Sequence, residues 1–141
     1  DRKIAILGGG CNIKKKNMRD SPAIDIISAL QSAGAVVHAY DPVAMKEAAK
    51  VIGDVTWGKD AYDICDNADA VVLITEWNEF KALDLARLRD LMATPVLVDL
   101  RNVYDPQQVV NAGFIYRSIG RPTPERNLSE PATKAAAHAA A

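Results

Sequence analysis

The stretch from Met18 to Pro42 constrains the fold more than any other part of the chain. It reads M-R-D-S-P-A-I-D-I-I-S-A-L-Q-S-A-G-A-V-V-H-A-Y-D-P. Ser21 is suited to cap a helix and Pro22 to its first turn, because the N–H that proline lacks has no partner there. The apolar positions that follow recur at helical spacing (Ile24, Ile27 and Leu30). Gly34 is predicted to end this helix in a left-handed backbone conformation.

Short apolar segments precede and follow the predicted helix. Lys3–Leu7 reads K-I-A-I-L, and Ala35–Tyr40 reads A-V-V-H-A-Y. Both are rich in β-branched residues and short enough to be buried strands. Strand, helix and strand in this order form a βαβ unit, whose strands are parallel and whose crossover is right-handed.

The rest of the chain continues this alternation. Further helices are predicted at Val43–Val51, from Asp60 through Cys65, at Asn78–Met92 with a break at Asp84, and at Asp105–Ala112. Further strands are predicted at Asp54–Trp57, Asp69–Thr75, Pro95–Leu100 and Phe114–Ile119. The predicted fold class is α/β, an open, doubly wound, mainly parallel six-stranded Rossmann-like sheet with helices on both faces. Residues 1–121 are expected to form this domain, and residues 122–141 a poorly ordered Pro- and Ala-rich tail.

Charge and composition exclude several partners. Seventeen basic and eighteen acidic side chains give a net charge of −1, which predicts neither a nucleic-acid nor a membrane partner. No apolar run approaches the roughly 20 residues of a membrane-spanning helix. The two cysteines form no close-spaced motif and no signal peptide is visible, so we expect a cytoplasmic protein. Because the first residue is Asp1, we expect a fragment, a processed product or an incompletely known sequence.

In a doubly wound sheet, ligands bind beyond the carboxyl ends of the strands. After the first predicted strand, Gly8–Gly10 resemble the start of a dinucleotide fingerprint, but Ile13 occupies the third glycine position and the helix starts too late. Lys14–Lys16 and the free N–H groups at the start of the helix favour a loop that faces phosphate. A solvated loop with a solvated lysine run is the alternative, and both remain open.

Three other strand ends carry candidate residues. Asp41 is placed to accept hydrogen bonds from a ribose, although a helix cap is the favoured interpretation. Trp77 is placed so that its indole could form one side of a nucleotide site, although a buried core residue is the favoured interpretation. Arg101 is placed to bind a pyrophosphate through two parallel hydrogen bonds. The alternative for Arg101 is a surface ion pair with Asp99 or Asp105.

The sequence offers no recognisable catalytic or metal-binding set. Cys11 has no histidine near it in sequence, and Cys65 is predicted to lie in the core. His38 falls in a predicted buried strand and His138 in the tail, so they form neither a metal site nor a Ser-His-Asp arrangement. We therefore expect no catalytic residue and no metal in this chain.

Several segments resemble the C-terminal, UDP-binding domain of bacterial UDP-glucose 6-dehydrogenases, in the UDP-glucose/GDP-mannose dehydrogenase family. They are M-R-D-S-P-A-I-D-I-I at 18–27, A-Y-D-P at 39–42, T-E-W-N-E-F at 75–80, V-D-L-R-N-V-Y-D-P at 98–106 and Y-R-S-I-G-R at 116–121. The resemblance covers about residues 2–121, and several segments in the right order are more specific than any single motif.

The resemblance implies an oxidoreductase that converts UDP-glucose to UDP-glucuronate for polysaccharide biosynthesis by two hydride transfers to NAD. The NAD domain and the catalytic cysteine of the family are not in this chain, so it should be inactive alone, and the full-length enzyme should be a homo-oligomer. Arg101 matches the arginine that contacts the UDP-sugar, and Arg19 one that reaches the NAD site. Cys11 and Asn12 occupy the positions of a phenylalanine and a lysine that touch the substrate in the family.

Two alternatives remain at this stage. One is a freestanding nucleotide-binding or regulatory module that uses Gly8–Gly10 and Asp41. The other is a dehydrogenase of the same family for a different nucleotide sugar, such as GDP-mannose or UDP-N-acetylmannosamine.

Overall fold

The computed structural model describes residues 2–8, 22–42, 46, 49–50, 52–75, 78–118 and 124. Most of the predicted helix at 43–51 lies outside these residues, although Lys46 and Ala49 are helical. Trp77 and, apart from Pro124, the predicted tail at 122–141 also lie outside them.

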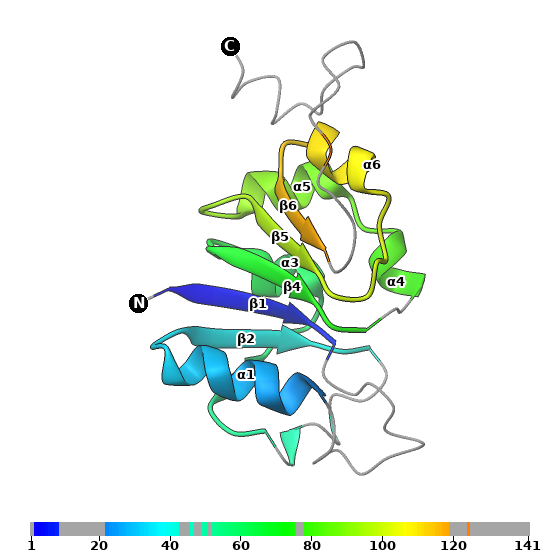
Figure 1. Cartoon of the computed structure of the whole chain (residues 1–141). Coiled ribbons are helices and arrows are strands. Elements are labelled where there is room, and N and C mark those ends of the chain that lie inside the picture. Colours follow the sequence, from blue (N-terminus) through cyan, green and yellow to red (C-terminus); the bar gives the residue numbers. More distant parts are fainter. Residues whose placement is uncertain are drawn as a thin grey trace.

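The chain folds into a six-stranded sheet with helices between the strands (Figure 1). The strands are β1 (Lys3–Leu7), β2 (Val36–Tyr40), β3 (Val55–Trp57), β4 (Ala70–Leu73), β5 (Val96–Asp99) and β6 (Ile115–Ser118). The helices are α1 (Pro22–Ser32), α3 (Ala61–Cys65), α4 (Asn78–Lys81), α5 (Leu85–Leu91) and α6 (Pro106–Asn111). The strand order is β3-β2-β1-β4-β5-β6 and neighbouring strands are parallel, which confirms the predicted doubly wound fold.

Helices start where the sequence supplies a capping oxygen. Aspartates precede α3, α5 and α6, and their side chains accept backbone N–H bonds: Asp60 from Asp63 (2.7 Å), Asp84 from Arg87 (3.1 Å) and Asp105 from Gln107 (3.1 Å). Such a cap satisfies one of the free donors of a helix's first turn. The cap at Asp84 divides the predicted helix at 78–92 into α4 and α5, at the break that the sequence indicated.

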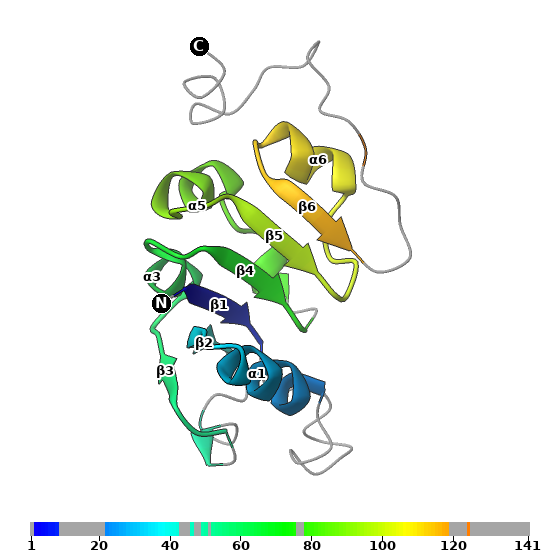
Figure 2. The same cartoon turned by 60° about the vertical axis from the view of Figure 1, so that its left-hand side comes forward.

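Side chains alternate between the two faces of the sheet and form two apolar layers. Leu7, Leu73 and Leu97 pack on the face covered by α3, α5 and α6. Ile6 and Val72 pack on the opposite face, where α1 contributes the fully buried Ile27. Figure 2 shows α1 in front of one half of the sheet, with α5 and α6 beyond the other half. Helices therefore cover both faces, as predicted.

Two glycines have backbone conformations that other residues rarely adopt. Gly34 has a φ of 92° and ends α1, which confirms the prediction. Gly8 follows β1 with a φ of 117°. A Cβ at Gly34 would meet nothing within 4 Å, whereas a Cβ at Gly8 would lie 2.4 Å from Oγ1 of Thr75. Gly34 is thus required for its backbone alone, and Gly8 for both its backbone and the space that it leaves.

This difference gives a matched pair of substitutions. Gly34→Ala should lower the free energy of unfolding by about 1 kcal/mol, the cost of the positive φ. Gly8→Ala should lower it by about 2–4 kcal/mol, because overpacking against Thr75 adds to the same backbone cost. Urea unfolding of both variants measures the two losses. Equal losses would show that the contact with Thr75 relaxes without cost.

Candidate functional site

The winding of the sheet reverses between β1 and β4. From β1 the chain builds outward through β2 to β3, and from β4 it builds the other way to β6. Backbone hydrogen bonds continue beyond the ends of these strands. The N–H of Ile74 donates to the carbonyl of Leu7 (2.9 Å), which extends the pairing of β4 with β1, and the N–H of Gly8 donates to the carbonyl of Tyr40 (2.8 Å), which extends the pairing of β1 with β2. In such sheets the crevice at the carboxyl side of the reversal is where ligands bind.

Buried polar residues gather at this same edge. Three polar or charged side chains are buried among the residues that the structure describes: Asp41 (1% exposed), Thr75 (3%) and Asp99 (0%). Asp41 directly follows β2, Thr75 lies two residues after β4, and Asp99 is the last residue of β5. Burial of polar groups is costly and therefore more informative than burial of apolar ones. Their placement makes the carboxyl edge the candidate functional part of the domain.

Thr75 and Gly8 face each other across the reversal point. The side chain of Thr75 occupies the space beside Gly8 that a Cβ would fill. Its hydroxyl is buried and has no hydrogen-bond partner among the residues that the structure describes. An unpaired buried hydroxyl costs about 1–3 kcal/mol, so this arrangement is not explained by stability.

Asp99 organises the turn that follows β5. Its Oδ1 accepts the backbone N–H groups of Arg101 (3.2 Å) and Val103 (3.0 Å). Its Oδ2 accepts the backbone N–H of Tyr104 (2.9 Å) and the hydroxyl of Tyr116 (3.0 Å). Both carboxylate oxygens are thus paired twice, which compensates for full burial of the charge.

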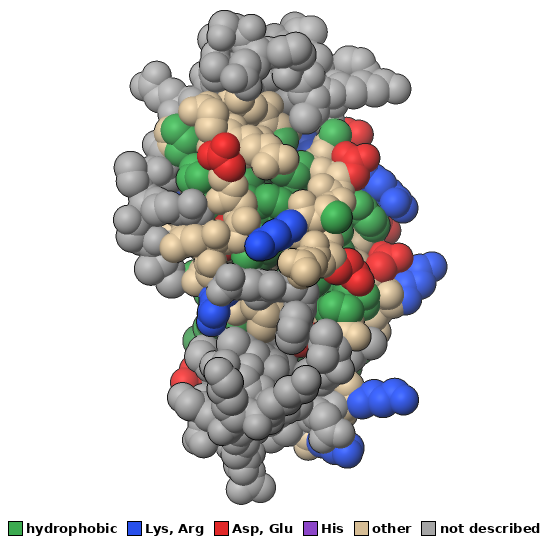
Figure 3. Space-filling model, turned by 90° about the vertical axis from the view of Figure 1, so that its right-hand side faces the viewer, with side chains coloured by type: hydrophobic (Ala, Val, Ile, Leu, Met, Phe, Trp, Pro, Cys, Tyr) green, Lys and Arg blue, Asp and Glu red, His purple; other side chains and the backbone are tan. Residues whose placement is uncertain are grey.

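The turn brings Arg101 to the carboxyl edge as an exposed residue. Asn102 has a φ of 53°, a left-handed conformation that asparagine tolerates better than most residues. Figure 3 looks onto the edge at which the strands of Figure 1 end; one basic side chain lies near the centre of this view among hydrophobic and uncharged surface, and others lie toward the rim beside acidic side chains. A guanidinium in this position is suited to bind an anionic oxygen pair.

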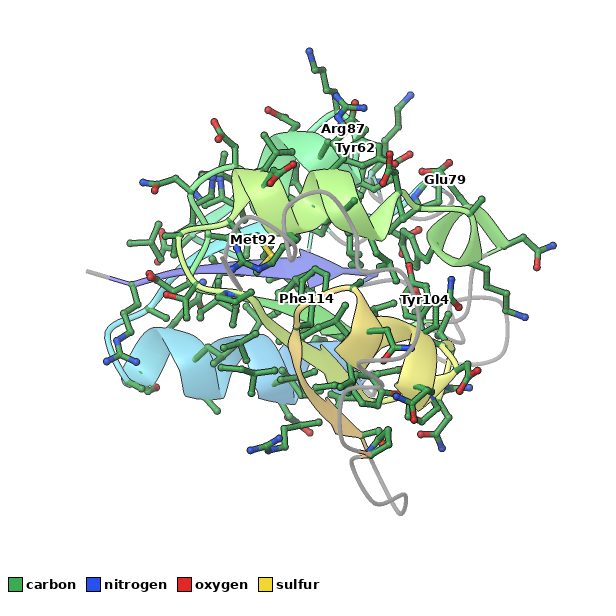
Figure 4. All side chains as sticks on the ribbon, turned by 90° about the horizontal axis from the view of Figure 1, so that it is seen from above. Tyr62, Glu79, Arg87, Met92, Tyr104 and Phe114 are labelled. Carbon is green, nitrogen blue, oxygen red and sulfur yellow. The ribbon has the colours of Figure 1, made fainter. Side chains whose placement is uncertain are left out.

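Three buried aromatic residues, Tyr40, Phe80 and Tyr104, contact one another near the same edge of the sheet. The hydroxyl of Tyr104 donates to the carbonyl of Phe80 in α4, and the Phe80 ring meets the Tyr40 ring edge-on at 6.4 Å. Figure 4 shows Tyr104 between α6 and α4. Burial raises the pKa of Tyr104, and burial with the nearby Glu79 carboxylate raises the pKa of Tyr40 to about 12. Both phenols are therefore neutral hydrogen-bonding groups at physiological pH.

The titratable groups in the interior are unsuited to nucleophilic or metal chemistry. Cys65 is fully buried in α3, as predicted, and burial raises the pKa of its thiol to about 12. Burial, together with the charge of Lys3, lowers the pKa of His38. Within the described residues, no three His, Cys, Asp or Glu side chains are grouped to hold a metal ion, and no helix is long and apolar enough to cross a membrane.

The structure brings Arg101 and Asp41 to one edge of the sheet, as their positions after two strands predicted. Cys11, Asn12 and Arg19, the other predicted binding residues, lie outside the described residues. As the alternative for Arg101, the sequence analysis considered a surface ion pair with Asp99 or Asp105. Asp99 does not lie at the surface, because it is completely buried. The sequence feature that could have identified Asp99 is a carboxylate at the end of an apolar strand, directly before a turn.

The sheet and its edge define a Rossmann-like, nucleotide-binding class of domain. The chain belongs to the UDP-glucose/GDP-mannose dehydrogenase family, whose UDP-binding domain model matches residues 5–106.

Relatives of known activity cover the same region. The chain is 52% identical over 120 residues to a UDP-glucose 6-dehydrogenase of Rhizobium meliloti (strain 1021), covering 85% of this chain and 28% of the relative. It is 39% identical over 122 residues to the UDP-glucose 6-dehydrogenase TuaD of Bacillus subtilis (strain 168), covering 86% and 26%. The chain thus spans little more than a quarter of these relatives.

Solved structures agree with this assignment. A UDP-D-ManNAc dehydrogenase from Pyrococcus horikoshii superposes with a TM-score of 0.64 at 28% identity, over 86% of this chain and 26% of that one. A UDP-glucose dehydrogenase from Pyrobaculum islandicum superposes with a TM-score of 0.63 at 27% identity, over 82% and 24%.

The state of Cys65 can be tested by its reactivity. In a Cys11→Ser variant, a thiol reagent at pH 8 should modify Cys65 more than about 1,000-fold more slowly than in the urea-unfolded chain, because the raised pKa leaves almost no thiolate and burial blocks access. Ellman's reagent followed by absorbance measures both rates. Comparable rates in the folded and unfolded chains would contradict the buried, protonated thiol.

Proposed function

We propose that this chain is the UDP-sugar-binding domain of an NAD-dependent UDP-glucose 6-dehydrogenase, which oxidises UDP-glucose to UDP-glucuronate. Family membership and 52% identity to a UDP-glucose 6-dehydrogenase support the proposal. The observation that carries it is Arg101 at the carboxyl edge, after β5 and next to β4 of the reversal, on a turn whose backbone N–H groups Asp99 accepts. Residues 1–121 form the domain in this proposal, and residues 122–141 a tail.

The domain's part is to bind and orient the nucleotide. Arg101 would bind the diphosphate with two parallel hydrogen bonds from its planar guanidinium. Cys11 and Asn12, in the loop after β1, would contact the substrate from the other side. Gly8, at the end of β1, leaves room for the side chain of Thr75 at the reversal point.

NAD would accept the hydride and is proposed to bind mainly on a domain outside this chain. Only Arg19 of this chain is proposed to reach it. The Gly8–Gly10 segment lacks the third glycine of a dinucleotide fingerprint, so the crevice of this sheet suits the UDP-sugar rather than NAD. The full-length enzyme is further proposed to be a cytoplasmic homo-oligomer.

A different nucleotide sugar is the second candidate. The solved structures that resemble this chain include dehydrogenases of UDP-N-acetylmannosamine at 28% and 25% identity. Identity to UDP-glucose 6-dehydrogenases rises to 52%. UDP-glucose is therefore the favoured substrate, and a UDP moiety is common to both candidates.

The role of Arg101 predicts a graded loss of UDP affinity. Arg101→Lys should weaken binding by about 1–2 kcal/mol, because lysine keeps the charge but cannot make two parallel hydrogen bonds. Arg101→Ala should weaken it further. Titration of UDP followed by amide chemical shifts measures even millimolar dissociation constants.

Arg87→Ala is the matched control for this titration. It removes the same charge from an exposed arginine that stacks on Tyr62, 3.9 Å from the ring centroid, at a distance from Tyr104 and its turn (Figure 4). Its UDP affinity should equal that of the unmutated chain. Unchanged affinity in Arg101→Ala would remove the proposed diphosphate contact.

The missing domains predict that the chain has no dehydrogenase activity alone. Incubation of the purified 141-residue chain with UDP-glucose and NAD should give no more absorbance at the NADH band than a buffer blank. The reason is that the chain would supply a nucleotide-binding surface, whereas its sequence has no complete NAD fingerprint and its described residues include no activated nucleophile. Formation of NADH above the blank would contradict the prediction that this chain is inactive without the rest of the enzyme.

A further inference from the structure

We infer that Asp99 is the positioning residue of the nucleotide site: its buried carboxylate fixes the backbone turn that presents Arg101 to the diphosphate. The inference rests on the proposed function for the identity of the ligand. It adds Asp99 to the proposed site as a residue that does not contact the ligand, and it gives a physical reason why this residue is a carboxylate.

The hydrogen bonds of Asp99 span the whole turn. Its carboxylate accepts the backbone N–H groups of Arg101, Val103 and Tyr104 at 3.2, 3.0 and 2.9 Å. One side chain thus binds the residue that carries the guanidinium and two of the next three residues. A neutral amide cannot replace it, because an NH2 group in place of either oxygen would face two donors.

The turn is also tied to the rest of the domain. Tyr116 in β6 donates its hydroxyl to Oδ2 of Asp99 at 3.0 Å, and both side chains are fully buried. Tyr104 donates its hydroxyl to the carbonyl of Phe80 in α4. These two bonds tie the turn that carries Arg101 to β6 and to α4.

The sign of the effect separates positioning from simple electrostatics. Asp99 adds a negative charge to the edge at which a diphosphate would bind. If charge alone mattered, Asp99→Asn would strengthen UDP binding by removing repulsion. If Asp99 positions Arg101, the same substitution weakens binding, because the guanidinium loses its fixed geometry.

The first measurement uses the chain without ligand. In Asp99→Asn, amide hydrogen exchange of Arg101, Val103 and Tyr104 should accelerate at least about tenfold, since their acceptor is lost or misplaced. Amides of α1 should exchange as before. Asp84→Asn is the control, because it removes the same charge at the cap of α5 and asparagine also caps helices. Unchanged exchange in the turn would overturn the inference.

The second measurement is a double-mutant cycle on UDP affinity. Asp99→Asn should weaken UDP binding about tenfold, Asp84→Asn should leave it unchanged, and Asp99→Asn should have no weakening effect in the Arg101→Ala background. A purely structural role would weaken binding equally in both backgrounds and would overturn the inference. Equal or tighter binding in Asp99→Asn alone would also overturn it.

Tyr116→Phe provides the test if Asp99→Asn does not fold. It removes one of four donors and leaves the ring in place, so it should weaken UDP binding about twofold to threefold, again only when Arg101 is present. Unchanged affinity in this variant would then overturn the inference. Failure of the proposed function is distinct, because the unmutated chain and Asp84→Asn would then not bind UDP at all.

Discussion

The parallel pairing of β1 with β4 is the constraint on which the rest of this structure depends. It places the reversal of winding at the centre of the sheet and brings the carboxyl ends of all six strands to one edge. Strands that are buried on both faces leave polar groups few places to reach solvent or a ligand. Polar side chains at the ends of β2, β4 and β5 are therefore the expected result of this topology, and these are the buried polar residues observed.

The two halves of the edge solve different physical problems. At the reversal point, the absent Cβ of Gly8 leaves room for Thr75, whose buried hydroxyl has no hydrogen-bond partner within the described part of the chain. At β5, the buried carboxylate of Asp99 accepts the backbone N–H groups of the following turn and the hydroxyl of Tyr116. The first arrangement leaves hydrogen-bonding capacity unused, whereas the second uses it to hold the backbone of the turn.

The sequence predicted the fold, and it placed its candidate site at the carboxyl ends of the strands, because both predictions follow from local signals. Helical periodicity, aspartate caps and Gly34 gave the elements, and the order of strands and helices gave the parallel sheet. The observed strands are shorter than predicted by one residue or more at most ends. Arg101 was identified from its place after a strand, which needs no knowledge of side-chain contacts.

Asp99 could not be identified in the same way, because its role depends on contacts between distant residues. The hydroxyl of Tyr116 reaches it from β6, and Tyr104 turns back to α4 to donate to Phe80. A sequence pattern shows a carboxylate and a guanidinium two positions apart, and an ion pair is the simplest interpretation. The burial of Asp99 favours a different role from a surface ion pair. A carboxylate removed from water needs several hydrogen-bond donors, and the backbone N–H groups of the following turn are the nearest ones. The same burial that makes Asp99 costly is what makes its hydrogen bonds strong enough to fix the backbone of Arg101.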